Sequence, residues 1–161
     1  MHQAAFDFIK QFSSKEEMSV IEIGSRNING SVRSLFPNAV WIGLDLHAGP
    51  DVDWVGDSTQ YEPASKVDMV VCCESLEHAE GWYDMIRVAA DWVKPFGRML
   101  ITCAGPGRAP HSHIDGCQLR PGEHYNNVSA VDMRRCLTDA GMTVLICHQL
   151  GDDTQAVAVK P

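Results

Sequence analysis

The chain has 161 residues, of which 45% are hydrophobic and 21% charged, and its formal net charge is −8. This length favours a single domain over residues 1–161, and the acidic balance argues against nucleic acid as a partner, because phosphate binding needs a basic face. No run approaches the ~20 apolar residues of a membrane span, and the first residues lack the basic and apolar regions of a signal peptide. We therefore expect no membrane partner.

Six cysteines raise the question of disulfides. Four of them, Cys72, Cys73, Cys103 and Cys147, lie in apolar, strand-like runs, and the sequence has no C-x-x-C pair. Buried free thiols are the favoured interpretation. They predict a protein of the reducing cytoplasm.

Helical and strand-like patterns alternate along the chain. Ala5, Phe8, Ile9 and Phe12 have the spacing of an amphipathic helix. Ser129 and Asp132 resemble a capping box. After the first helix the patterns predict, in chain order, a strand over 18–23, a helix over 31–36, strands over 40–44, 52–55 and 67–73, a helix whose buried stripe runs over 82–93, a strand over 98–103, a helix between residues 129 and 141, and strands over 142–148 and 155–160.

This alternation is typical of a three-layer α/β sandwich around a mostly parallel sheet. The nearly continuous apolar run Val67–Cys73 suits a parallel strand that is covered on both faces. The Gly151-Asp152-Asp153 turn predicts a hairpin that makes the last strand antiparallel. We therefore predict a Rossmann-like sandwich with a mostly parallel seven-stranded sheet and an antiparallel C-terminal hairpin strand.

The stretch from Val20 to Gly30 carries the strongest functional signal. An apolar run ends in an acid, Glu22, and a turn at Gly24 leads into the predicted helix over 31–36. The N–H groups of such a turn and the positive end of a helix dipole suit a polar ligand. The next apolar run closes on Asp45, about twenty residues further on, where folds of this kind bind a ribose.

Five motifs in this order resemble those of the class I S-adenosylmethionine-dependent methyltransferases, over almost the whole chain. They are Glu22-Ile23-Gly24 at the end of the first strand, Asp45 at the end of the second, Gly56-Asp57-Ser58, the run Asp68-Met69-Val70-Val71-Cys72-Cys73-Glu74-Ser75-Leu76-Glu77-His78, and Pro95-Phe96-Gly97-Arg98 before the fifth strand. The resemblance implies the cofactor S-adenosylmethionine and the transfer of its methyl group to an acceptor oxygen or nitrogen.

The resemblance also implies roles for the matching residues. Asp45 would hold the ribose hydroxyls and Asp57 would contact the adenine amine, although ordinary turn chemistry is an equal alternative for Asp57. Glu22 would lie near the amino end of the methionine tail, whose carboxylate would meet the N–H groups of residues 24–27. The full set implied to bind the cofactor is Glu22, Gly24, Ser25, Arg26, Asn27, Gly30, Asp45, Leu46, Asp57, Ser58, Cys73, Glu74 and His78.

The glycine turn departs from the family pattern. The family commonly has E-x-G-x-G-x-G, whereas Arg26 and Ile28 occupy the second and third glycine places here. A side chain at these places alters how closely the backbone approaches a cofactor. A non-catalytic cofactor-binding subunit that supports a partner enzyme therefore stays an alternative. A nicotinamide-dependent dehydrogenase is less favoured, because its G-x-G-x-x-G fingerprint is absent.

A long irregular stretch over 104–127, rich in glycine and proline, follows the predicted strand 98–103. It contains His111, His113 and His124, which offer a general base for a hydroxyl acceptor. The H-x-H pattern lacks the paired spacings of a structural zinc site, so we expect no metal.

The acceptor is expected to be a small molecule or of sugar type, because the chain is acidic. Little of the sequence lies outside the predicted core. Two alternatives follow: the site is open to a bulky acceptor, or a second copy of the chain or a partner subunit completes the lid.

Overall fold

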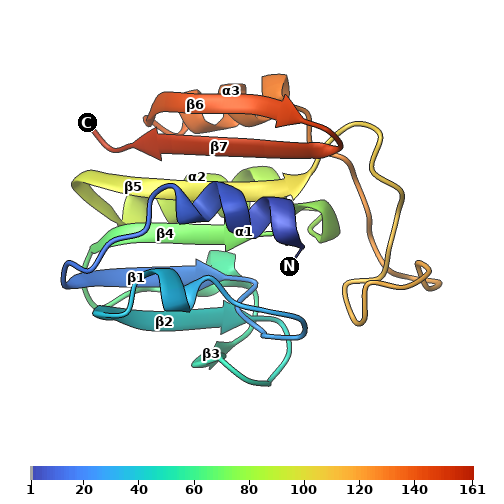
Figure 1. Ribbon diagram of the computed structural model, residues 1–161, viewed down its shortest axis with the longest axis horizontal. Coiled ribbons are helices and arrows are strands. Elements are labelled where there is room, and N and C mark those ends of the chain that lie inside the picture. The colour runs from blue at the N-terminus through green and yellow to red at the C-terminus, as the bar shows by residue number, and fades with distance from the viewer. Residues whose placement is uncertain (1) are drawn as a thin grey trace.

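One seven-stranded sheet organises the computed structural model, which describes residues 2–161 (Figure 1). The strands lie in the order β3-β2-β1-β4-β5-β7-β6, and only β7 runs antiparallel to its neighbours. Their bounds are β1 (Met18–Ile23), β2 (Ala39–Asp45), β3 (Trp54–Val55), β4 (Val67–Cys73), β5 (Val93–Ala104), β6 (Thr143–Leu150) and β7 (Asp153–Val159). The predicted mostly parallel sheet with an antiparallel hairpin strand is confirmed.

Helices cover both faces of this sheet. Helix α1 (Gln3–Lys10) lies across the face nearest the viewer in Figure 1, while α2 (Trp82–Trp92) and α3 (Ala130–Asp139) lie behind the strands. Short 3₁₀ helices, η1 (Arg33–Leu35), η2 (Ser58–Gln60) and η3 (Leu76–His78), stand in the connections. The three-layer arrangement follows from strands that are apolar on both sides.

The strands divide their apolar side chains between two cores, as the two-residue period of a strand requires. In β4, Met69 and Val71 pack toward α1, whereas Val70 and Cys72 pack toward α2 and α3. The core on the α2 and α3 side is the larger of the two. The α1 side is closed by Phe8, Ile9, Val32 and Phe36, among others.

The predicted helix over 31–36 is wrong. The chain forms only the single turn η1 at Arg33–Leu35 between Gly30 and Pro37. Six residues between a glycine and a proline are too few to repay the cost of nucleating a helix, and Val32 is a poor helix former. The expected helix dipole at this point is therefore absent among the described residues.

Other boundaries differ by a few residues. β3 is limited to Trp54–Val55 instead of 52–55, and β5 begins at Val93, directly after α2, instead of at Arg98. The capping prediction at α3 is confirmed, since Ser129 Oγ accepts the Asp132 N–H at 3.1 Å. Residues 105–129 have no helix or strand, as expected for the glycine- and proline-rich stretch.

All six cysteines are free thiols, and Cys117 is the exposed one. Within the part of the chain that the structure describes, no helix is long and apolar enough to cross a membrane.

Candidate active site

A cleft of about 1140 Å³ lies at the carboxyl ends of β1, β2 and β4. This is the edge at which open α/β sheets bind ligands. His111, His113 and His124 reach it from the irregular loop 105–129. Of the residues implied to bind a cofactor, those that line the cleft are Glu22, Gly24, Ser25, Arg26, Gly30, Asp45, Leu46, Asp57, Ser58, Cys73, Glu74 and His78.

Asn27 is the implied residue that does not line the cleft. Its amide nitrogen donates to Asp51 Oδ2 at 2.9 Å, and its Oδ1 accepts the Gly30 N–H at 3.0 Å. Asn27 therefore braces the turn from within.

The turn after β1 does not offer its backbone N–H groups to a ligand, contrary to expectation. All four N–H groups of residues 24–27 donate to the protein itself: Gly24 and Ser25 to the Leu44 carbonyl, Arg26 to Asp45 Oδ2, and Asn27 to the Pro50 carbonyl. The first of these hydrogen bonds continues the parallel β1–β2 ladder, in which Ile23 is the last residue of β1 and pairs with Leu44. A ligand carboxylate in this cleft needs a different partner.

Glu22 ends β1 with its side chain almost fully buried, and it has a partner within the fold. Its Oε2 accepts from Arg33 Nε at 2.9 Å. Burial raises the pKa of Glu22, and the Arg33 guanidinium opposes that rise. The same guanidinium donates to the Asp51 carbonyl at 2.7 Å, so that η1 is held against both β1 and the loop after β2.

Asp45 and Asp57 face the cleft in different ways. Asp45 Oδ2 accepts the Arg26 N–H at 3.2 Å and Oδ1 accepts the His47 N–H at 2.9 Å. Each carboxylate oxygen can accept a further hydrogen bond. Asp57 is exposed, and its Oδ1 caps η2 by accepting the Thr59 N–H at 2.9 Å. Turn chemistry thus accounts for one oxygen of Asp57.

Glu74, just after β4, has a φ of +55° and belongs to an ionic cluster. Its Oε2 lies 2.9 Å from His2 Nε2 and 3.3 Å from the Arg108 guanidinium, which also pairs with Asp153. Burial raises the pKa of Glu74, but the hydrogen bond from His2 and the charge of Arg108 outweigh burial and leave the pKa below its usual value. His2 and Arg108 thereby connect the N-terminus and the loop 105–129 to the end of β4.

Glu77 and His78 form the last part of η3, next to His111. Glu77 is fully buried, and burial together with the charge of Glu74 raises its pKa to about 8. Burial, with the nearby His111 and His113, lowers the pKa of His78 to about 4. The His78 ring packs edge-on against His111 and Tyr125, with ring centroids 4.9 and 5.5 Å away.

The three histidines considered as bases occupy different surroundings. His113 Nδ1 lies 3.2 Å from Glu123 Oε1, and its ring stacks on His47 at 5.6 Å. His111 packs against His78 and Tyr125. His124 also lines the cleft, but within residues 2–161 it has no ring contact with the other histidines.

Three residues of this site were not predicted from the sequence. His2 and Arg108 carry no recognisable motif, because only the fold brings the chain start and a distant loop to Glu74. Glu77 did stand in the Leu76-Glu77-His78 signature, so its position was available. The burial of Glu77 could not be predicted, because no sequence pattern indicates that η3 points Glu77 into the core while His78 lines the cleft.

The arrangement of strands and cleft is that of the class I methyltransferase fold. Three solved structures share it. They are 1,6-didemethyltoxoflavin-N1-methyltransferase of Burkholderia thailandensis with 1,6-didemethyltoxoflavin and S-adenosylhomocysteine (15% identity, TM-score 0.72, covering 98% of this chain and 78% of that one), magnesium protoporphyrin IX methyltransferase of Synechocystis with S-adenosylmethionine (18%, 0.69, 99% and 80%), and a Haloferax volcanii methyltransferase in complex with the Trm112 methyltransferase activator (16%, 0.64, 91% and 84%).

The sequence itself gives the family. The chain belongs to the methyltransferase-domain family, whose model matches residues 1–146. A comparison with curated protein sequences gave no match. The predicted methyltransferase membership is confirmed, and the family match does not support a nicotinamide-dependent dehydrogenase.

Proposed function

We propose that the chain transfers the methyl group of S-adenosylmethionine to an oxygen or nitrogen of a small-molecule acceptor. The observation that carries this proposal is the position of Asp45 at the carboxyl end of β2, inside the cleft. Each of its carboxylate oxygens accepts one hydrogen bond within the protein and can accept another. Such a carboxylate can accept hydrogen bonds from both hydroxyls of a ribose. The cleft volume of about 1140 Å³ has room for a cofactor and a second small molecule.

The methionine tail needs a cation for its carboxylate, because the N–H groups of residues 24–27 are used within the protein. In our proposal Arg26 supplies it. Arg26 lines the cleft from the same turn, and a guanidinium binds a carboxylate through two parallel hydrogen bonds. Arg26, which departs from the family's glycine pattern, would thereby bind the carboxylate in place of the N–H groups of residues 24–27.

The acceptor would enter beside the loop 105–129. Among the three candidate bases, His113 is favoured, because Glu123 Oε1 lies 3.2 Å from its Nδ1 and orients the ring. Much of the catalysis would come from positioning, since a sulfonium is already a good leaving group. Full turnover by a His113→Ala enzyme that binds cofactor normally would refute this role.

A small acceptor is supported by the acidic chain and by the small molecules named for two of the similar structures. Residues 1–161 act as one domain in this proposal, because one sheet runs through them. Six free thiols support a reducing compartment such as the cytoplasm.

A second candidate is a cofactor-binding subunit that needs a partner or a second copy to complete its lid. The occupied N–H groups of the turn favour it, since they remove one usual way of holding a cofactor. The similar Haloferax volcanii methyltransferase is one that was solved with an activator protein. Cofactor binding without methyl transfer to any member of a broad acceptor panel would favour this candidate.

The experiment that tests the proposed cofactor site is a calorimetric titration with two ligands, S-adenosylhomocysteine and 5′-methylthioadenosine, which lacks the amino-acid tail. We expect S-adenosylhomocysteine to bind wild-type protein in the micromolar range, on the order of −8 kcal/mol. Asp45→Asn should weaken both ligands roughly 10- to 100-fold, as the loss of charge-assisted hydrogen bonds predicts. Arg26→Gln should weaken only S-adenosylhomocysteine.

The matched control is Asp91→Asn, an exposed acid on α2 outside the cleft. Its affinities should equal those of the wild type. If Asp45→Asn binds both ligands normally, the ribose site lies elsewhere. If Arg26→Gln weakens both ligands equally, Arg26 shapes the turn and does not bind the tail.

A further inference from the structure

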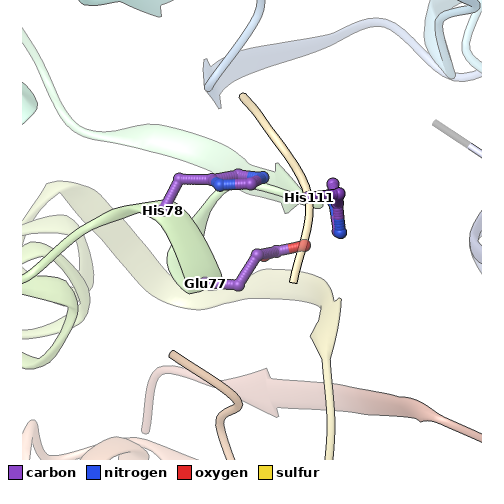
Figure 2. A group of neighbouring side chains, drawn as sticks. All are labelled: Glu77, His78 and His111. Atoms are coloured by element: carbon purple, nitrogen blue, oxygen red, sulfur yellow. The ribbon is translucent and has the colours of Figure 1, made fainter. Parts of the chain in front are cut away.

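Three metal-binding side chains meet where η3 faces the loop 105–129. Glu77 and His78 come from η3, and His111 comes from the loop (Figure 2). One potential ligand atom from each of the three lies within 4.8 Å of the other two. In Figure 2 the Glu77 carboxylate and the two imidazole rings converge on a common space.

Polar atoms in this cluster lack the partners that buried groups normally have. Glu77 is 0% exposed, and neither of its carboxylate oxygens has a hydrogen-bond partner of good geometry within residues 2–161. The backbone groups of Glu77 and Ala104 lie close enough to oppose the rise of its pKa. His78 Nδ1 is likewise buried without a partner in the described chain. Leaving such groups unpaired is unfavourable, so their convergence favours an occupant of this space.

The groups that contact the two imidazole rings suit metal coordination. His111 Nδ1 lies 3.2 Å from the Ala109 carbonyl, which fixes the ring and leaves Nε2 as the available nitrogen. The Tyr125 ring packs against both imidazoles and restricts their rotation. In a tetrahedral zinc site with bonds of about 2.0–2.2 Å, the ligand atoms lie about 3.3–3.6 Å apart, so atoms as far apart as 4.8 Å would approach one another by roughly 1.2–1.5 Å when the ion binds.

A second cluster, His2, Glu74 and Asp153, has similar spacing but already contains a cation. The Arg108 guanidinium pairs with both of its carboxylates. A metal ion there would have to compete with Arg108 and would be repelled by it. The cluster around Glu77 is therefore the better site.

We propose that Glu77, His78 and His111 bind one divalent first-row transition-metal ion, with zinc as the reference ion. Two imidazoles and one carboxylate are a ligand set for such ions, and three protein ligands leave a coordination position open. His78 and His111 line the cleft, so the ion would lie at its wall. If the proposed methyl transfer holds, the open position would take an acceptor oxygen and lower its pKa; that role rests on the proposed function, whereas metal binding does not.

The expectation of no metal from the sequence concerned residues of the loop 105–129 only. The proposed site takes one of them, His111, together with Glu77 and His78 of η3. His113 instead pairs with Glu123. The proposal therefore differs from that expectation in its ligand set.

The proposal is tested by titrating Co²⁺ and then Zn²⁺ into the tag-free, full-length chain and following the visible absorption of bound Co²⁺. We expect one ion per chain with micromolar or tighter affinity, and displacement of Co²⁺ by Zn²⁺. Glu77→Gln and His111→Ala should each weaken binding by more than about 100-fold, the upper end of what losing an outer partner of a ligand costs. His124→Ala, a cleft histidine outside the cluster, should bind Co²⁺ like the wild type.

Circular dichroism of each variant separates lost binding from lost folding, and His111 lies on a loop where truncation leaves the core intact. Wild-type protein that binds neither ion would overturn the proposal, as would unchanged affinity in both folded variants. Failure here is distinguishable from failure of the proposed function. A chain that binds Co²⁺ but no S-adenosylhomocysteine keeps the metal site and loses the methyltransferase proposal, and the opposite result does the reverse.

Discussion

Gly24 adopts a φ of +72°, and a Cβ built on it would lie 1.8 Å from Ser75 Oγ. Both the backbone conformation and the available space therefore demand glycine. Arg26 and Ile28, at the later glycine places of the family pattern, are not among the described residues with positive φ. The departure at these two places thus imposes no backbone strain, because of the three glycine places of the family pattern only Gly24 has a positive φ.

Gly24→Ala should consequently lower the free energy of unfolding by about 3 kcal/mol or more, because left-handed strain of about 1–3 kcal/mol adds to the clash with Ser75. The matched control is Gly141→Ala, which has a φ of +75° but open space around the new Cβ. The free energy of unfolding of that variant should fall only by the cost of the backbone strain. Urea denaturation measures both values, and equal losses would show that the clash with Ser75 is relieved at no cost.

Among the elements, η1 shows how a minimal connection is stabilised without a helix. Arg33 joins η1 to Glu22 of β1 and to the Asp51 carbonyl, and its guanidinium lies 5.2 Å from the centre of the Trp41 ring of β2. Arg33 thus anchors η1 to the sheet in addition to the apolar contacts of Val32 and Phe36, which flank it. The dependence on a single, largely buried ion pair makes this element sensitive to substitution.

Arg33→Ala should reduce the free energy of unfolding by about 3 kcal/mol, because it leaves the buried Glu22 carboxylate without its partner. Adding Glu22→Gln should restore part of the loss, since the uncompensated charge is then removed. The control is Arg87→Ala on α2, whose exposed pair with Asp84 should contribute about 0.5 kcal/mol or less. A double variant that loses the sum of the two single losses would contradict the coupling of Arg33 and Glu22.

At the scale of the whole molecule, the reactivity of the cysteine thiols measures how completely the two cores exclude solvent. Cys72, Cys103 and Cys136 are buried, and Cys73 and Cys147 are partly buried. Burial raises the pKa of all five thiols, which keeps them protonated and unreactive at neutral pH. Cys117, exposed on the loop 105–129, stands apart from them.

A thiol-reactive chromogenic disulfide should therefore modify one cysteine rapidly in native protein and all six after denaturation in guanidinium. The Cys117→Ser variant should lose the rapid phase and leave five reactive thiols on unfolding. Two or more rapid thiols in that variant would mean that the native cores open faster than their burial implies.

Much of the fold followed from local patterns. The continuous apolar run Val67–Cys73 and the turn at Gly151 were enough to predict a parallel sheet that ends in an antiparallel hairpin, because strand period and turn chemistry are local properties. The predicted helix over 31–36 was wrong, although it came from the same kind of local pattern. Its residues allow a weak helical pattern, but Gly30 and Pro37 leave no length for a helix, and Arg33 compensates through contacts distant in sequence.

The sequence by itself determined the family, the alternation of strands and helices along the chain and the acids at the ends of β1 and β2, because each depends on residue types at short spacings. Only the tertiary structure decided which polar groups are already paired. In the tertiary structure Glu22 pairs with Arg33, and N–H groups of the turn after β1 donate to the end of β2. His111 lies next to Glu77 and His78. These pairings depend on how loops far apart in the chain close over one sheet edge, and no local pattern encodes that closure.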